Sequence, residues 1–254
     1  MKISSTAAVW INANPSFKHF DGRIIRYISN QMPIAYWEYH QELDEASSID
    51  IALVLLHDYL KSKSEPVNLI GHGTGGLLAL LYARKYPYRV KSLTLLGVGS
   101  APSIDWQAHY YQMRKLLPCS REVILDRLVK MMFGHQSRRN VASLIEILKQ
   151  DLVTAPTAHS LYQIDRIESG GVSMPMMVCG SEQDGIIDRS SLQGWTDYLK
   201  NDDILWTMPK GHHFFHYFFP EQTGRKIIKF WQNVDVQKSI SSKFNSEEIC
   251  CHYF

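Results

Sequence analysis

Short apolar runs of strand length alternate with longer segments of helical spacing along most of this chain. The apolar runs cover residues 7–11, 34–37, 67–70 and 90–97, and helical spacing follows at 19–31, 48–61 and 75–86. Short apolar runs that are bounded by loops and separated by helices are typical of strands buried in a parallel sheet. The pattern predicts an α/β fold with a mostly parallel central sheet and helices on both faces.

The alternation stops between residues 101 and 168, where the spacing is helical only, with segments predicted at 121–133 and 141–152. It resumes with strands predicted at 174–179 and 204–208 and helices at 190–200 and 221–231. We interpret the helical stretch as a lid over the carboxyl ends of the strands. Residues 1–100 and 169–236 then form the core, 101–168 the helical lid, and the serine-rich residues 237–254, which lack periodicity, a flexible tail.

Composition narrows the class of protein. With 254 residues, 45% of them hydrophobic and 20% charged, the chain fits one α/β domain. A net charge of +2, with lysine and arginine scattered along the chain, indicates no nucleic-acid partner. The four cysteines form no disulfide framework, which favours the cytoplasm. No apolar run could span a bilayer, and residues 1–5 lead straight into a strand, so neither a transmembrane segment nor a signal peptide is predicted.

The most informative segment is the glycine-rich stretch at residues 71–76, directly after the apolar run 67–70. It is built like a nucleophile elbow, in which a strained strand-to-helix turn exposes one side chain and glycines stand on either side of it. Gly73 occupies the apex, so the position of the nucleophile carries no oxygen or sulfur.

The same glycines superficially resemble a phosphate-binding loop, but no acidic residue stands about twenty positions later to bind a ribose, where the chain has Lys91 and Ser92. The sequence also contains no metal-ligand spacing. We therefore predict no cofactor and no metal.

Four motifs in order resemble the α/β-hydrolase superfamily, in its lidded branch of esterases, lipases and dehalogenases, over residues 7–231. These motifs are Asn12-Ala13-Asn14-Pro15, Leu69-Ile70-Gly71-His72 with Gly75-Gly76, the segment from Val178 to Asp184, and Lys210-Gly211-His212-His213-Phe214. The resemblance implies that Asp184 is the acid and that His213, or His212 beside it, is the histidine.

The resemblance also implies an oxyanion hole formed by the backbone N–H groups of Asn14 and Thr74, with Asn12 and His72 beside it. Two departures fall at the catalytic centre. Gly73 replaces the nucleophile, and Asn12-Ala13 replaces the usual His-Gly. The resemblance also implies that the first predicted strand corresponds to the strand that is normally third, so we expect no counterpart of the family's first antiparallel hairpin.

Three functions remain open on the sequence. The first is a non-hydrolytic protein that binds a small apolar molecule or a protein partner, which the joint loss of the nucleophile and of His-Gly favours. The second is an enzyme that uses Asp184 and His213 as a general base, which the presence of both positions favours. The third is a serine esterase or acyl hydrolase whose nucleophile is replaced by Gly73.

Overall fold

Six parallel strands form one central sheet with the strand order β2-β1-β3-β4-β5-β6. The computed structural model describes residues 7–40, 48–157, 159–163 and 166–250, and no side chain is described at 238 or at 240–250. The strands are β1 (Ala8–Asn12), β2 (Ile34–Glu38), β3 (Val67–His72), β4 (Val90–Leu96), β5 (Met176–Ser181) and β6 (Ile204–Met208). The predicted α/β fold with a parallel sheet is confirmed.

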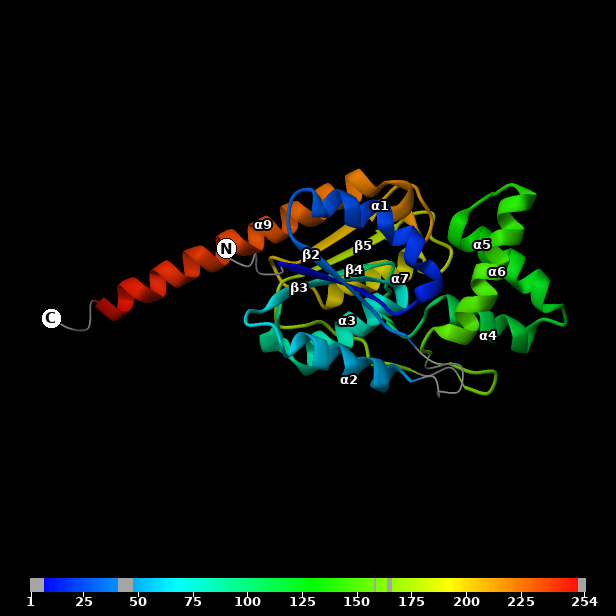
Figure 1. The fold of residues 1–254 in the computed structure, drawn as a ribbon, viewed down its shortest axis with the longest axis horizontal. Helices are drawn as coiled ribbons and strands as arrows, with labels where there is room; N and C mark the ends of the chain where they lie inside the picture. The colour runs from blue at the N-terminus through cyan, green and yellow to red at the C-terminus, as the bar shows by residue number, and fades with distance from the viewer. Residues whose placement is uncertain (1–6, 41–47, 158, 164–165, 251–254) are drawn as a thin grey trace.

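Helices cover both faces of the sheet (Figure 1). Trp10 and Ile70 pack with α1 (Lys18–Ser29) and α9 (Pro220–Cys250) on one face. Val9 and Leu69 pack with α2 (Ile49–Leu60) and α3 (Gly73–Lys85) on the other. Because neighbouring residues of a strand point to opposite faces, strands buried on both sides are mostly apolar. This explains the continuous apolar runs in the sequence. The short helices α7 (Arg189–Gln193) and α8 (Phe215–Phe218) complete this core.

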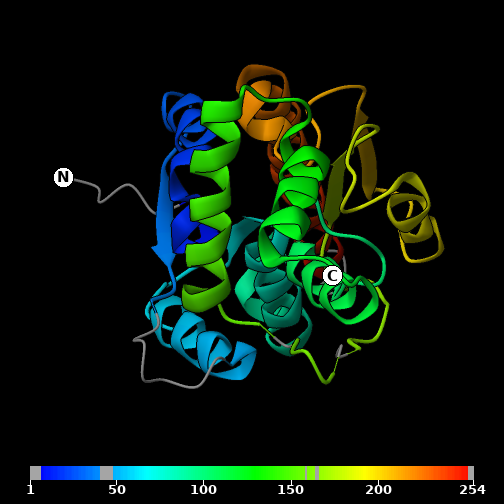
Figure 2. The ribbon, with the colours of Figure 1, turned by 90° about the vertical axis from the view of Figure 1, so that its right-hand side faces the viewer.

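A helical insertion of α4 (Trp106–Leu116), α5 (Arg121–Phe133) and α6 (Arg138–Thr154) lies at one end of the core (Figures 1 and 2). Each of these helices begins at a side-chain cap, because Asp105, Ser120 and Ser137 accept a hydrogen bond from the backbone N–H three residues later. The sequence predicted the segments of α5 and α6, and gave no separate boundary for α4.

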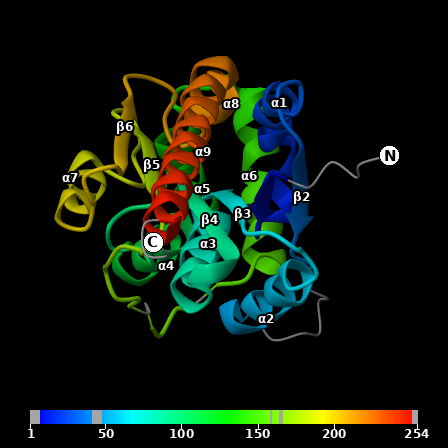
Figure 3. The same cartoon turned by 90° about the vertical axis from the view of Figure 1, so that its left-hand side faces the viewer.

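Helix α9 is longer than the sequence predicted. Val234 is buried against the core and Asp235 pairs with Lys91 of β4, whereas Val236 is exposed. The backbone nevertheless stays helical to Cys250, past residue 237 where the sequence predicts a tail, and the helix leaves the body of the protein (Figures 1 and 3). No glycine or proline follows Gly224, and extending a helix costs less free energy than starting one.

No helix in the described part of the chain combines the length and the hydropathy that a bilayer crossing requires.

Glycines bring the backbones of β1, β3 and α3 into direct contact. A Cβ atom on Gly75 would lie 2.3 Å from the carbonyl oxygen of Ile11, and one on Gly71 would lie 2.5 Å from the backbone of Gly75. These distances are far shorter than any van der Waals contact, so only glycine permits this packing.

We predict that Gly75→Ala destabilises the fold by about 3 kcal/mol, because the new methyl group must displace backbone rather than a side chain. Gly22 in α1 is the matched control, because it is exposed and a Cβ there meets nothing within 4 Å. Gly22→Ala should stabilise the protein by about 0.5–1 kcal/mol. Urea denaturation of both variants measures these changes, and equal stabilities would contradict the steric argument.

Candidate functional site

The turn between β3 and α3 places Gly73 at its apex with a left-handed backbone, φ 51°. In contrast to Gly71 and Gly75, this glycine has room for a side chain. A Cβ atom here would have one neighbour within 4 Å beyond the adjacent residues, Nε2 of His213 at 3.8 Å. The apex is therefore a vacant side-chain position that faces an imidazole.

His213 and Asp184 form a buried pair. His213 Nδ1 donates to Asp184 Oδ2 at 2.9 Å, and the two side chains are 3% and 0% exposed. The other carboxylate oxygen, Oδ1, accepts from the backbone N–H groups of Ile186 at 2.8 Å and Ile187 at 3.0 Å. Because the proton of a neutral imidazole is on Nδ1 in this arrangement, the lone pair of Nε2 points toward the apex.

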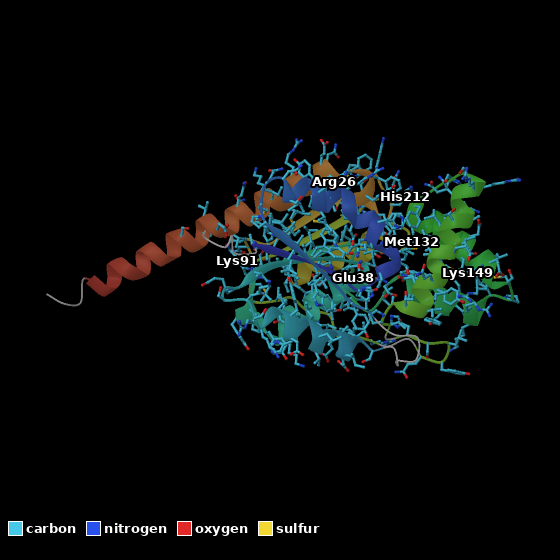
Figure 4. The ribbon with its side chains drawn as sticks, viewed as in Figure 1. Arg26, Glu38, Lys91, Met132, Lys149 and His212 are labelled. Atoms are coloured by element: carbon cyan, nitrogen blue, oxygen red, sulfur yellow. The ribbon has the colours of Figure 1, made fainter. Side chains whose placement is uncertain are left out.

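Of the two adjacent histidines, His213 reaches Asp184 and His212 does not. His212 adopts a positive φ of 52°, and its Nδ1 lies 2.9 Å from the carbonyl oxygen of Gln183. Figure 4 shows His212 near Met132, at the junction between the core and the helical insertion. The strained backbone of His212 thus turns the two imidazoles in different directions.

His72 holds the backbone of His213 by a hydrogen bond. Its Nε2 donates to the carbonyl oxygen of His213 at 3.0 Å, and its ring lies 4.5 Å from the ring of His213 and 4.5 Å from that of His216. Burial lowers the pKa of His72 well below its usual value, so this imidazole is neutral. Its contacts make it a positioning group for His213.

The backbone N–H of Asn14, one of the two predicted oxyanion donors, is already used. It donates to Asn12 Oδ1 at 2.7 Å, and the Asn12 amide group also contacts the hydroxyl of Tyr36. The N–H of Thr74 lies in the first turn of α3, where backbone N–H groups have no partner within the helix. The Thr74 hydroxyl faces Asp105 at 3.4 Å. The loop itself therefore occupies one of the two predicted oxyanion donors, the N–H of Asn14.

A buried carboxylate that sequence reasoning missed, Asp151 of α6, joins the helical insertion to this loop. Its Oδ2 accepts from Asn14 Nδ2 at 2.9 Å, Trp106 Nε1 at 3.1 Å and Gln107 Nε2 at 3.4 Å. Leu144, Leu148 and Asp151 stand four and three residues apart, so the carboxylate lies on the apolar face of its helix. This position on the apolar face is the feature of the sequence from which the burial of Asp151 could have been predicted.

The pKa of Asp151 is raised to about 7, chiefly by burial and to a smaller extent by nearby Asp105. The three hydrogen-bond donors act in the opposite direction and lower it. Asp151 Oδ1 and Gln107 Oε1 are both buried and have no hydrogen-bond partner within the described part of the chain. A proton on Oδ1 turns one of these two acceptors into a donor and removes a buried charge. The protonated acid is thus the form that suits this site.

Aromatic side chains fill the space between the core and the helical insertion. Phe133 of α5 stacks on Phe214 with ring centroids 4.7 Å apart and planes at 9°, while Trp106 of α4 packs on Phe17 at 6.0 Å. Phe20 contacts both members of the stack. These residues are all buried. Buried rings thus fill the space between α5 and the loop that carries His213.

No group of three or more histidine, cysteine, aspartate or glutamate side chains among the described residues could hold a metal ion. Cys179 is buried within β5, where burial raises the pKa of its thiol, and Cys119 lies between α4 and α5. Neither thiol occupies the apex.

Comparisons with known proteins agree on one fold. Residues 59–128 match the family described as "alpha/beta hydrolase fold". The uncharacterized protein alr2406 of Nostoc sp. is 45% identical over 224 residues, 88% of this chain and 90% of that protein. The uncharacterized protein sll0249 of Synechocystis sp. is 39% identical over 237 residues, covering 93% and 94%. A meta-cleavage product hydrolase of Pseudomonas fluorescens superposes with a TM-score of 0.64 at 13% identity, covering 89% and 90%.

We predict that Asp151 makes the stability of the protein pH-dependent. Its pKa of about 7 in the folded state lies above its value of about 4 in an unfolded chain. Its contribution is therefore complete below about pH 4, is lost as the pH rises to about 7, and stays constant above that; the loss is up to about 4 kcal/mol.

Asp151→Asn places a neutral amide in the same space and should remove this slope. The variant should therefore be more stable than the natural protein at about pH 8 and closer to it at about pH 5. Urea denaturation at both pH values measures this, with the exposed Asp126→Asn as control. Parallel pH profiles for the natural protein and Asp151→Asn would contradict the assignment.

Proposed function

We propose that this chain, which has the α/β-hydrolase fold and no side chain at the nucleophile position, is a non-hydrolytic protein that binds a small apolar molecule. The observation that carries the proposal is the geometry of Gly73, whose side-chain position faces His213 Nε2 at 3.8 Å. Acyl transfer in this superfamily needs an oxygen at that point, between the histidine and the carbonyl carbon. Here His213 can accept a proton, but residue 73 has no hydroxyl group from which to take it.

Neighbouring side chains do not replace the missing oxygen. Thr74 is one residue beyond the apex, and its hydroxyl points to Asp105. Because the backbone N–H of Asn14 already donates to Asn12, the carbonyl oxygen of a bound ester would have one fewer hydrogen-bond donor. The buried rings of Phe133 and Phe214 fill the space between α5 and the loop that carries His213. The nucleophile and one of the two oxyanion donors are thus absent together, which favours a non-hydrolytic role.

A structural role explains why Asp184 and His213 are both present. The backbone N–H of His213 donates to the carbonyl oxygen of Met132 at 3.1 Å, and that of Gly185 donates to Met131 at 3.3 Å. Both carbonyl groups belong to the last turn of α5, where helices leave such groups unpaired. The Asp184–His213 hydrogen bond holds the two loops that supply these donors. The pair therefore attaches the helical insertion to the core, and in this proposal the insertion is a lid held shut.

A second candidate is an enzyme that uses His213 as a general base without a covalent step. The free Nε2 lone pair favours this function, since no described residue donates a hydrogen bond to it and Asp184 fixes the tautomer. Such an enzyme would activate water or remove a substrate proton at the apex.

We expect the natural protein to hydrolyse p-nitrophenyl butanoate and p-nitrophenyl dodecanoate no faster than His213→Ala does. The reason is that neither protein has a nucleophile for the ester carbonyl, and the release of p-nitrophenol measures the rate. Thermal melts of both proteins show that the comparison is between folded chains. Turnover that is lost in His213→Ala would overturn the non-hydrolytic proposal and establish the general-base enzyme.

Adding the missing oxygen tests whether the remaining geometry is that of a hydrolase. Gly73→Ser should be covalently labelled by a fluorophosphonate probe, at a backbone strain of about 1–2 kcal/mol. Asn12→Ala in the same background frees the Asn14 N–H and should speed labelling by up to about a hundredfold. Mass spectrometry follows both reactions, with Gly73→Ser/His213→Ala as the slow control. A folded Gly73→Ser that never reacts would show that the apex is not a nucleophile position.

A further inference from the structure

Two neighbouring cavities open beside the aromatic stack, between the helical insertion and the core. One has a volume of about 330 Å³ and the other about 270 Å³. Phe133 and Phe218 line both of them. The two cavities therefore adjoin at these side chains. We call them together the furrow, and name the first the α6 chamber and the second the His212 chamber.

The α6 chamber is lined by aromatic and aliphatic side chains together with His19, Gln136, Asn140 and Ser143. Helix α6 faces it with Asn140, Ser143, Leu144 and Ile147, which are spaced at i, i+3, i+4 and i+7 and so share one side of the helix. Aromatic rings that include Tyr217 form the opposite wall. No lysine, arginine, aspartate or glutamate lines this chamber. Its lining therefore suits an uncharged apolar body.

The His212 chamber has the opposite character. Lys210, His212 and His135 line it, and no carboxylate does. The positive φ of His212, 52°, turns this side chain away from the Asp184–His213 pair and over the turn at Gly134. A backbone strain of this kind costs about 1–3 kcal/mol, and such strain is concentrated at ligand sites. The chamber thus presents one cation and two imidazoles to a common space.

Phe218 marks the junction of the two chambers. Phe218 is 37% exposed, whereas Phe133, Phe214 and Phe215 are buried. An exposed aromatic ring at the shared wall is available to cover an apolar chain that passes from one chamber to the other.

We propose that the furrow is a binding site for a carboxylate-headed apolar molecule, with the apolar body in the α6 chamber and the carboxylate at Lys210 and His212. This inference rests on the proposed binding function and names its site and ligand class. The stacked rings of Phe133 and Phe214 separate the furrow from His213. The ligand is therefore held outside the vacant apex, where no chemistry reaches its carboxylate.

Three probes with the same chain and different heads test the charge of the site: dodecanoate, dodecanol and dodecylammonium. Calorimetric titration of the full-length protein, below the concentration at which each probe forms micelles, measures the affinities. Dodecanoate should bind at least about tenfold more tightly than dodecylammonium, with dodecanol between them, because a cationic pocket attracts one head and repels the other. Equal affinity for the three heads, or no binding of dodecanoate, overturns the proposal.

Matched variants locate the site. Lys210→Met should weaken dodecanoate about fivefold and leave dodecanol unchanged, since an exposed charge pair contributes modestly. Lys130→Met is its control, because Lys130 is an exposed lysine of α5 that pairs with Asp126 and lines neither chamber. Ser143→Trp fills the α6 chamber from an exposed position and should weaken all three probes. Unchanged affinities in both Lys210→Met and Ser143→Trp would overturn the proposed location.

Hydrolysis of p-nitrophenyl dodecanoate by the same samples separates the two proposals. His213-dependent hydrolysis overturns the non-hydrolytic function whatever the titration shows. If the protein neither hydrolyses the ester nor binds dodecanoate, the furrow is not the proposed binding site. The non-hydrolytic function then still stands.

Discussion

The contact between Gly75 and the carbonyl oxygen of Ile11 sets the geometry on which the rest of the site depends. It holds the first turn of α3 directly against the end of β1, a distance that allows no side chain between the two backbones. The turn before α3 must then project Gly73 beyond the carboxyl ends of the strands. The loops after β5 and β6 end at the same edge of the parallel sheet, which is why Asp184 and His213 meet there.

The helical insertion is attached to this edge by two buried polar contacts of different kinds. At α5, the His213 imidazole, which is oriented by the Asp184 carboxylate, lies on the loop whose backbone N–H caps the helix. At α6, the carboxyl group of Asp151 accepts hydrogen bonds from Asn14, in the loop after β1, and from Trp106 of α4. Buried polar groups are costly unless paired, so each contact specifies one docked arrangement that apolar packing alone would leave less defined.

The strands and most helices could be predicted because burial on both faces favours largely apolar runs, as at residues 8–11 and 67–70. The positions of Asp184 and His213 followed from motifs at strand ends. The bond between Asn14 and Asp151 could not be predicted, since it joins residues 137 positions apart and depends on how the helical insertion docks. The occupied N–H of Asn14 was missed for a related reason: a local side-chain acceptor, Asn12, competes for it.

The four glycines of the turn are under unequal constraint, and this has an evolutionary consequence. Gly71, Gly75 and Gly76 are fixed by contacts that folding itself requires, whereas the apex has room for a side chain. Selection for a stable fold therefore preserves three of these positions in every descendant, active or not. At the fourth, a side chain costs only the strain of the left-handed backbone, about 1–2 kcal/mol. One substitution at this position can therefore add or remove a nucleophile while the scaffold around it stays folded.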